Sequence, residues 1–343
     1  MPDVGIRISV IKGTDCHGPL GLAMTWNFAT LVTDMNKTTS TPVGRFAPTP
    51  SGRMHLGNVF AALIAWLSVK SRNGHLVLRM EDLDTQRTSD EFAAQLREDL
   101  RWLGLTWDLE TAPQSQRSAV YDKYFEKLEA LGLLYPCYCT RSQLHNVNAP
   151  HLSDGTYVYA GTCRNLTEAQ KAAFDRQPAW RVQVPDKLWQ VDDLCQGTYT
   201  ENLATDCGDF VVRRADGVYV YQLAVTVDDG EAGVTEVVRG MDLLSSAPRQ
   251  MYLQELFGFA HPEYGHVPML LAPDGRRLSK RDKDMDLSFL QQHTTPEALL
   301  GLLGYACGIL DRQIPISAQE LAGEFTWGKL NSKDIYLDIS SLL

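Results

Sequence analysis

The chain has 343 residues, 44% of them hydrophobic, and its 42 acidic residues against 32 Lys and Arg give a net charge of -10. This composition is that of an ordinary folded protein and excludes collagen, coiled coils and wholesale disorder. No run reaches the roughly 18 to 20 apolar residues of a membrane helix, so we expect no membrane partner. The negative charge argues against a general nucleic-acid coat, although a local basic face can still contact RNA.

Residues 1–42 lack a clear hydrophobic period and end in the polar stretch 36–42, which is typical of a linker. We expect this N-terminal extension to be disordered or to precede the native start, and Met35 is a candidate for that start. No secretory cleavage pattern follows the patchy apolar segment near residues 20–32. The seven cysteines are an odd number without an export signal, which predicts a reduced, cytoplasmic protein.

Strands and helices alternate from Val43 onward. Thr88 and Glu91 form a candidate capping box, and Gly104 and Gly132 are suitable residues to end two helices. The hydrophobic periods predict strands at 43–47 and 75–80 and helices at 56–67, 88–104 and 117–131. Strands alternating with helices of this length predict an α/β fold with a parallel sheet covered on both faces.

The alternation stops near Pro136 and returns near residue 210. Within this stretch, Thr167 and Gln170 predict a capping box and residues 180–184 an isolated strand. Further predicted elements are a hairpin at 210–223 turned at Asp216–Gly217, a strand at 234–238, a helix at 247–257, a strand at 267–271 and a last helix starting at Thr295–Pro296. We expect five parts: the extension 1–42, a first half-fold 43–135, an insertion 136–209, a second half-fold 210–285 and a helical C-terminal segment 286–343.

The loop 48–58 links the first predicted strand to the first predicted helix, where an open α/β sheet binds its ligands. Free N–H groups and the helix dipole favour an anion there, His55 can donate to a phosphate oxygen, and Gly57 lets a nucleotide approach the backbone. Taken alone, this pattern is more often a Pro/Gly turn with a capping histidine.

A second basic loop at 276–281 follows a turn at Asp274–Gly275. Its cationic side chains around Ser279 can close over a triphosphate and stabilise the charge that develops on a leaving pyrophosphate. By itself it is more often a solvated basic loop. The two loops together, in this order and each at a strand end, favour an ATP site.

These segments carry a family resemblance. Residues 45–52 with His55-Leu56-Gly57-Asn58 resemble the HIGH signature of class I aminoacyl-tRNA synthetases, and residues 277–281 resemble their KMSKS loop. Residues 79–84 are similar to the R-x-E-D-x-D element of the glutamyl and glutaminyl members, and the match extends to residues 221–224, 227–229 and 233–240. Asn58 replaces the last histidine of HIGH, and Arg277 replaces the first lysine of KMSKS.

The resemblance implies a class I Rossmann-type sheet with an inserted zinc-containing α+β subdomain, and a reaction that uses ATP with Mg²⁺. His55 and Lys280 are then catalytic, and ATP contacts His55, Gly57, Asn58, Ser279 and Lys280. Glutamate carries two carboxylates and one ammonium, which calls for two cationic contacts and one anionic contact. By resemblance Glu81 receives the ammonium, and the pocket is lined by Arg45, Phe46, Ala47, Pro48, Thr49, Tyr221 and Arg239. Outside this pattern, Glu81 is more often a solvated acid and Arg45 part of a surface ion pair.

From the short stretch between Arg281 and Leu343, we expect no helical anticodon-binding domain like that of a discriminating glutamyl-tRNA synthetase. The chain resembles the truncated branch, the glutamyl-Q tRNA(Asp) synthetases. That resemblance implies activation of L-glutamate without tRNA and transfer to queuosine in tRNA(Asp). We expect the protein to be a monomer. A truncated synthetase that charges a tRNA 3′ end and a catalytically idle RNA-binding relative remain alternatives.

Three cysteines of the predicted insertion can supply thiolates to a tetrahedral metal, namely Cys137, Cys139 and Cys163. By the family resemblance Tyr159 is the fourth ligand of one structural Zn²⁺. His145 or His151 would be the conventional completion of such a site, and free buried thiols are the alternative to a metal.

Overall fold

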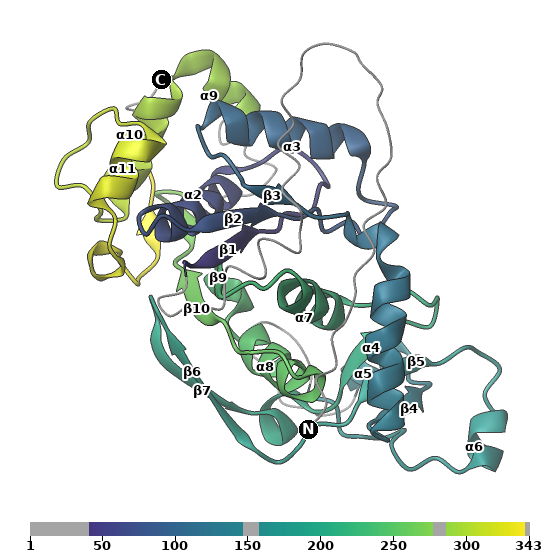
Figure 1. The fold of residues 1–343 in the computed structure, drawn as a ribbon. Helices are drawn as coiled ribbons and strands as arrows, with labels where there is room; N and C mark the ends of the chain where they lie inside the picture. The colour runs from purple at the N-terminus through teal and green to yellow at the C-terminus, as the bar shows by residue number, and fades with distance from the viewer. Residues whose placement is uncertain (1–40, 147–157, 277–285, 340–343) are drawn as a thin grey trace, which may run out of the picture. The chain divides into compact units, whose positions relative to one another are not determined.

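The computed structural model describes residues 41–146, 158–276 and 286–339 (Figure 1). Most of the predicted N-terminal extension, with Met35, lies outside these ranges. Within them, no helix is long and apolar enough to cross a membrane.

The largest sheet has seven strands in the order β3-β2-β1-β9-β10-β6-β7. Its neighbours pair in parallel except for β6 and β7, which form an antiparallel hairpin. The strands are β1 Val43–Phe46, β2 His75–Leu78, β3 Leu109–Glu110, β6 Leu188–Asp193, β7 Gly197–Asn202, β9 Glu236–Gly240 and β10 Glu263–Val267. The predicted α/β fold with a mostly parallel sheet is confirmed.

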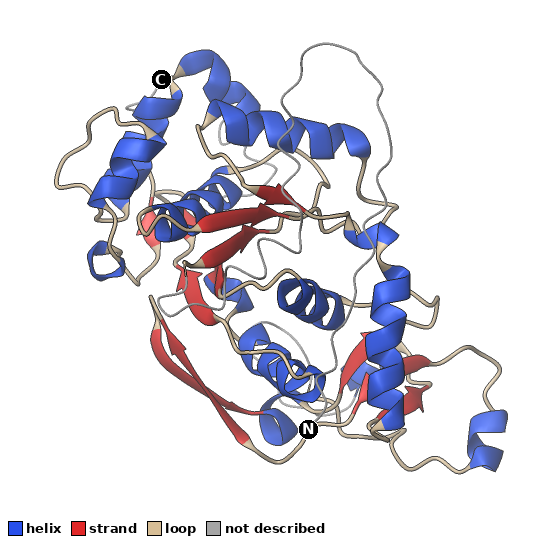
Figure 2. Cartoon of the chain, viewed as in Figure 1, coloured by secondary structure: helices blue, strands red, loops and turns tan. Residues whose placement is uncertain are grey.

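Helix α2, Leu56–Lys70, is the centre of the larger hydrophobic core. It packs against β1, β2 and β9, and against α11, Ala318–Glu324. Apolar residues cover nearly its whole surface because the sheet and a second helix contact different sides of it. Gly44 of β1 permits this close approach, since a Cβ there would lie 2.7 Å from Val69 Cγ1. Figure 2 shows the helices around the parallel strands.

The remaining long helices cover the sheet and a second core. They are α3 Asp90–Trp102, α4 Ser118–Ala130, α7 Tyr221–Glu231 and α8 Ser246–Phe257. Gly104 and Gly132 lie just beyond α3 and α4 with φ values of 72° and 69°, which confirms them as the residues that end these helices.

A smaller antiparallel sheet consists of β4 Leu134–Cys137, β5 Ala179–Val182 and β8 Phe210–Arg213. Beside it in the chain are α5 Arg141–Asn146, α6 Glu168–Ala172 and a π-helical turn at Leu203–Cys207. The capping box of Thr167 and Gln170 is present at the start of α6. The segment between β4 and β8 therefore contributes strands to both sheets, because its hairpin β6–β7 joins the edge of the larger one.

The C-terminal segment packs against α2 and against β10 of the main sheet. It contains α9 Leu287–His293, α10 Pro296–Ala306, α11, a 3₁₀ turn at Trp327–Lys329 and β12 Ile335–Tyr336, which pairs with β11 Leu270–Leu271. Trp327 donates to Ser68 Oγ of α2 at 3.0 Å. Its ring also lies against Gly265, where a Cβ would be 2.4 Å from the ring.

Local details differ from the sequence prediction at the start of α3. The N-cap is Ser89, whose Oγ accepts from Phe92 N, whereas the Thr88 hydroxyl donates to the carbonyl of Asp84. The helix thus begins one residue later than predicted, and Glu91 is one position too early to complete a capping box.

Three other predicted elements also change. The hairpin at 210–223 has no second strand, because Tyr221 begins α7 and the return consists of a bridge between Arg213 and Tyr219. The predicted strand 267–271 divides into β10 and β11, because Pro268 between them has no N–H for the sheet. The helix capped by Thr295 is not the last one, since α11 follows it.

Candidate active site and metal centre

A cavity of about 430 Å³ lies at the point of the main sheet where the strand order reverses. From β1 the sheet extends through β2 to one side and through β9 and β10 to the other. Such a switch point leaves a crevice at the carboxyl ends of the strands, which is where open α/β sheets bind ligands. Every proposed ligand residue that the structure describes in the loop after β1, after β2 and on β9 lines this cavity.

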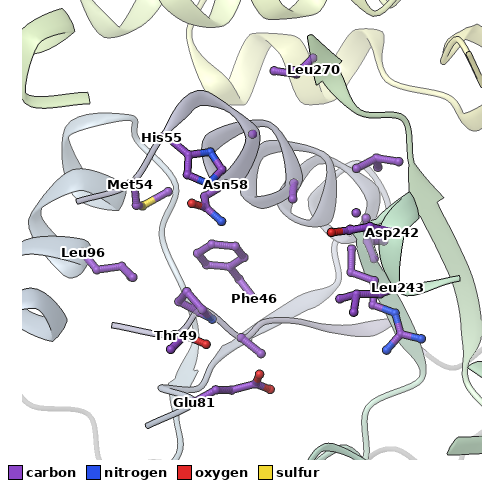
Figure 3. A pocket seen from close by; sticks show the side chains of 18 of the residues that line it. Phe46, Thr49, Met54, His55, Asn58, Glu81, Leu96, Asp242, Leu243 and Leu270 are labelled. Carbon is purple, nitrogen blue, oxygen red and sulfur yellow. The ribbon is translucent and has the colours of Figure 1, made fainter. Parts of the chain in front are cut away.

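The start of α2 forms one side of the cavity (Figure 3). His55 is the N-cap, with no side-chain hydrogen bond that caps the first turn, and Gly57 and Asn58 also line the cavity. The N–H groups and positive dipole of such a terminus favour a phosphate. The structure therefore brings together the HIGH-like residues predicted to contact ATP.

The segment after the second basic loop joins this region. His55 forms an antiparallel bridge with Asp286, and Leu287 N donates to the carbonyl of Met54 at 3.1 Å. Ser279 and Lys280 lie outside the described residues, so their place relative to the cavity stays a prediction.

Two buried arginines form the cationic part of the cavity. Arg45 is 4% exposed and donates from Nη1 to the carbonyl of Val238 at 2.7 Å. Arg239 is 5% exposed and donates to His266 and Gln250. Within the described ranges, Arg239 Nη2 is buried without a hydrogen-bond acceptor, whereas Arg45 Nε lies 3.5 Å from Asp229 Oδ2 in an ion pair. A carboxylate in the cavity is a suitable acceptor for the unpaired donor of Arg239.

Glu81 supplies negative charge on the same side of the cavity as Thr49, opposite His55 and Asn58 (Figure 3). Arg79 Nη2 donates to its Oε1 at 3.1 Å. Burial raises the pKa of Glu81 to about 7, although the charges of Arg79 and Arg45 act in the opposite direction. This carboxyl can therefore gain or lose a proton near neutral pH.

The sequence analysis did not predict a buried network of charged side chains behind the cavity. Arg79 is fully buried, donates from Nη1 to Asp229 at 2.7 Å and lies 3.6 Å from a carboxylate oxygen of Asp228. Asp228 in turn accepts from Gln114 at 2.8 Å. Arg79 and both aspartates belong to the matched motifs, but nothing in the motifs alone indicates that they contact each other.

The other predicted glutamate ligands also line the cavity. They are Phe46, Ala47, Pro48, Thr49 and Tyr221. The sequence prediction named no role for several further lining residues: Ser51, Gly52, Arg53, Met54, Ala61, Leu96, Val238, Gly240, Asp242, Leu243, Val267, Pro268, Met269 and Leu270. The first four lie within the HIGH-like loop, so their position in that motif could have indicated that they line the cavity. Most of the others are apolar residues or glycines, which no motif marks.

Three thiols gather beside the smaller sheet, as the cysteine pattern predicted. The ligand atoms of Cys137, Cys139 and Cys163 lie within 4.8 Å of one another, and the Sγ atoms of Cys139 and Cys163 are 3.6 Å apart. With Zn–S bonds of about 2.3 Å, neighbouring ligands of a tetrahedral site are roughly 3.7 Å apart. The spacing therefore fits a metal such as zinc.

The phenol of Tyr159 completes this cluster. Its oxygen is 3.5 Å from Cys137 Sγ and 3.8 Å from Cys139 Sγ, and it accepts from Cys163 N at 2.9 Å. Gly208 allows the tyrosine backbone to dock here, since a Cβ at Gly208 would lie 2.3 Å from the Tyr159 carbonyl oxygen. His151 lies outside the described residues.

Arg181 adds positive charge to the thiol cluster. Its Nε is 3.2 Å from Cys137 Sγ, and its guanidinium lies 3.7 Å from the centre of the Tyr159 ring. Burial alone would raise the pKa of Cys137, but Arg181 and the hydrogen bonds around the sulfur outweigh burial and lower it. These surroundings favour the thiolate at Cys137, whereas burial and the charge of Cys137 raise the pKa of Cys139 to about 12.

Comparison with known families identifies the chain. The catalytic domain of the class I tRNA synthetases (E and Q) matches residues 43–332. A glutamate tRNA ligase from Elizabethkingia meningosepticum, solved in complex with its amino acid, is 27% identical with a TM-score of 0.75, over 87% of this chain and 67% of that one. A glutamate-tRNA synthetase from Elizabethkingia anophelis is 26% identical with a TM-score of 0.76, over 87% and 68% of the two chains.

Two curated relatives match at higher identity. The glutamyl-Q tRNA(Asp) synthetase of Symbiobacterium thermophilum is 42% identical over 87% of this chain and 97% of its own length. That of Nitratidesulfovibrio vulgaris is 41% identical over 85% of this chain and 94% of its own. The chain therefore belongs to the class I tRNA synthetases for glutamate and glutamine and, within them, to the family of the glutamyl-Q tRNA(Asp) synthetases.

Proposed function

We propose that this protein activates L-glutamate with ATP and Mg²⁺ to glutamyl-adenylate without tRNA, and transfers the glutamyl group to queuosine in the anticodon loop of tRNA(Asp). The observation that carries the proposal is one cavity with two chemically different sides. The helix terminus at His55 offers a phosphate site, and buried Arg45 and Arg239 supply positive charge for carboxylates, with Arg239 Nη2 as an unpaired donor.

The activation step needs positioning and charge more than it needs a general base. An oxygen of the glutamate α-carboxylate attacks the α-phosphorus of ATP, a P–O bond forms, and the bond to the pyrophosphate breaks. Glu81 binds the ammonium, and the arginines orient the carboxylates. We assign Lys280 and Ser279 of the basic loop to the developing charge on the leaving pyrophosphate.

The transfer step joins the activated carbonyl to a hydroxyl of the cyclopentenediol of queuosine and releases AMP. An exposed modified base in a single-stranded loop suits a compact enzyme, because unstacked bases are the part of RNA most open to recognition. Membership in the family of the glutamyl-Q tRNA(Asp) synthetases supports tRNA(Asp) as the nucleic-acid partner.

For the cysteine cluster we propose one structural Zn²⁺ held by Cys137, Cys139, Cys163 and Tyr159. When bound, such an ion stabilises the fold around it and takes no part in catalysis. We further propose that residues 136–209 act as an inserted subdomain, and that the protein is a cytoplasmic monomer. The six cysteines within the described ranges form no disulfide with one another.

The decisive experiment is exchange of labelled pyrophosphate into ATP, measured with glutamate and without tRNA. We expect exchange under these conditions, followed by transfer of labelled glutamate to tRNA(Asp) that contains queuosine. Mapping the attached label to the anticodon loop supports the proposal, whereas a label on the 3′ end identifies a truncated charging enzyme. Exchange that requires tRNA, or no exchange at all, contradicts it.

A further inference from the structure

The Arg239 guanidinium is held from behind by a histidine. Arg239 on β9 and His266 on β10 are register partners in the sheet, and Arg239 Nε donates to His266 Nε2 at 3.0 Å. Nη1 donates to Gln250 at 2.8 Å, while Nη2 is the nitrogen without an acceptor within the described ranges. Two edges of the guanidinium are thus fixed by the protein, and one remains for a ligand.

This geometry determines the tautomer of the histidine. A guanidinium can only donate hydrogen bonds, so His266 Nε2 must accept and the ring proton must be on Nδ1. Nδ1 lies 2.5 Å from Asp193 Oδ2, which accepts that proton's hydrogen bond. Burial, with the nearby charge of Arg239, lowers the pKa of His266 to about 4, so the ring is neutral at physiological pH.

The backbone fixes the orientation of the aspartate in turn. Asp193 Oδ1 accepts from the backbone N–H of Cys195 and Gln196, each at 2.9 Å, and the N–H of His266 is shared between Oδ1 at 3.0 Å and Oδ2 at 3.1 Å. Three donors at Oδ1 leave Oδ2 directed at the imidazole. Because Asp193 ends β6, the hairpin from the segment between the two half-folds reaches the back of the cavity.

We propose that Asp193 and His266 are positioning residues that hold the Arg239 guanidinium in the orientation that binds a carboxylate of the substrate. This inference rests on the proposed function, in which Arg239 contacts glutamate. A neutral histidine behind the arginine suits this role, since it orients the guanidinium without neutralising the charge that a substrate carboxylate needs. A bond that served only to attach β6 to β10 would predict a loss of stability with unchanged substrate binding.

The substitution Asp193→Asn separates the two roles. The three backbone donors require an oxygen at the Oδ1 position, so the amide nitrogen must replace Oδ2 and donate to His266 Nδ1. The ring proton then moves to Nε2. This N–H faces the Nε–H of Arg239, and two donors cannot form a hydrogen bond. The side chain keeps its shape while the orientation of Arg239 is lost.

The test measures glutamate-dependent pyrophosphate exchange in the wild type, in Asp193→Asn and in the control Asp192→Asn. Asp192 is the exposed neighbour of Asp193, so the control makes the same chemical change outside the hydrogen bonds that link Asp193, His266 and Arg239. We expect the KM for glutamate to rise about 10- to 100-fold in Asp193→Asn, the usual effect of losing hydrogen bonds to a charged group. The KM for ATP should stay within about two-fold, and Asp192→Asn should match the wild type.

Long-range ¹H–¹⁵N correlation spectra of the histidine rings provide a readout that stability alone does not move. They should show protonated Nδ1 at His266 in the wild type and protonated Nε2 in Asp193→Asn. A changed tautomer with an unchanged KM for glutamate overturns the inference, as does an unchanged tautomer with a raised KM. Absence of glutamate-dependent exchange in the wild type instead contradicts the proposed function itself.

A second pair of variants covers the case in which Asp193→Asn does not fold. His266→Gln keeps an acceptor for Arg239 and a donor for Asp193, and we expect a glutamate KM within about three-fold of the wild type. His266→Phe keeps the bulk without either group, and we expect the 10- to 100-fold increase. Equal KM values in the two folded variants overturn the inference.

Discussion

Arg79 Nη1 donates to Asp229 Oδ1 at 2.7 Å, across 150 residues of sequence. Arg79 follows β2 and Asp229 lies in α7, so one buried ion pair joins the two halves of the fold behind the cavity. Burial alone would raise the pKa of Asp229, but Arg79 and Arg45 outweigh burial and lower it. The carboxylate therefore stays charged and depends on these partners.

Replacing Arg79 by methionine should destabilise the protein strongly. The change leaves the buried carboxylate of Asp229 without its nearest cation, and such a loss costs about 3–5 kcal/mol. Urea denaturation measures the free energy of unfolding. The control Arg87→Met removes an exposed arginine and should change that energy by no more than about 0.5 kcal/mol. Equal stabilities would contradict a structural role for the buried pair.

Glutamate binding should tighten as the pH rises from 6 to 8. The pKa of Glu81 is about 7, and only its deprotonated form can pair with the substrate ammonium, so the KM for glutamate should fall through this range and then level off. The pH profile of pyrophosphate exchange checks this. Glu81→Gln should raise the KM for glutamate and abolish its change between pH 6 and 8. Glu98→Gln, at an exposed position of α3, should leave that change as in the wild type. If the KM of Glu81→Gln for glutamate fell by the same factor over this pH range, the pH dependence would have to be assigned to another titratable group.

Gly57→Ala should impair use of ATP without harming the fold. An alanine Cβ there would lie 3.1 Å from the His55 ring, so the ring must move by a few tenths of an ångström. Displacement of a positioned group lowers catalytic efficiency, and we expect kcat/KM for ATP to fall about ten-fold. Gly323→Ala in α11 is the control, because no atom lies near its added Cβ. Wild-type efficiency in Gly57→Ala would argue against close nucleotide contact at this turn.

Cys139→Ser should lower the zinc content and the thermal stability together, because metal binding is coupled to folding. Metal analysis of the purified protein and thermal unfolding provide the two readouts. Cys195→Ser changes a half-buried thiol outside the cluster and should leave the zinc content unchanged. A Cys139→Ser protein that lacks metal yet melts at the wild-type temperature would refute a structural site.

Lys280→Ala should reduce the rate of adenylate formation by about 10² to 10³, the usual loss for one oriented charge donor. Single-turnover measurement of adenylate formation isolates this step. Lys333→Ala removes an exposed lysine of the C-terminal segment and serves as the control. Equal rates in wild type and Lys280→Ala would remove this lysine from the proposed mechanism.

The sequence determined the features that depend on neighbouring residues. The loop with His55 and Gly57, the acidic element at Glu81 and the cysteine pair at 137 and 139 are contiguous motifs, and parallel strands bring their loops to the same edge of a sheet. These motifs were therefore enough to indicate the family and those ligand residues, but not most of the other residues that line the cavity.

Only the tertiary structure decided how the buried charges pair. Asp193 meets His266 across 73 residues, through a strand that joins the edge of the main sheet, and no motif marks either residue. Arg79, which follows β2, likewise meets Asp229 of α7 only in the folded chain. The physical reason is the cost of removing a charge from water. A buried charge needs an opposite charge or a hydrogen bond, and the tertiary structure determines which group lies close enough to provide it.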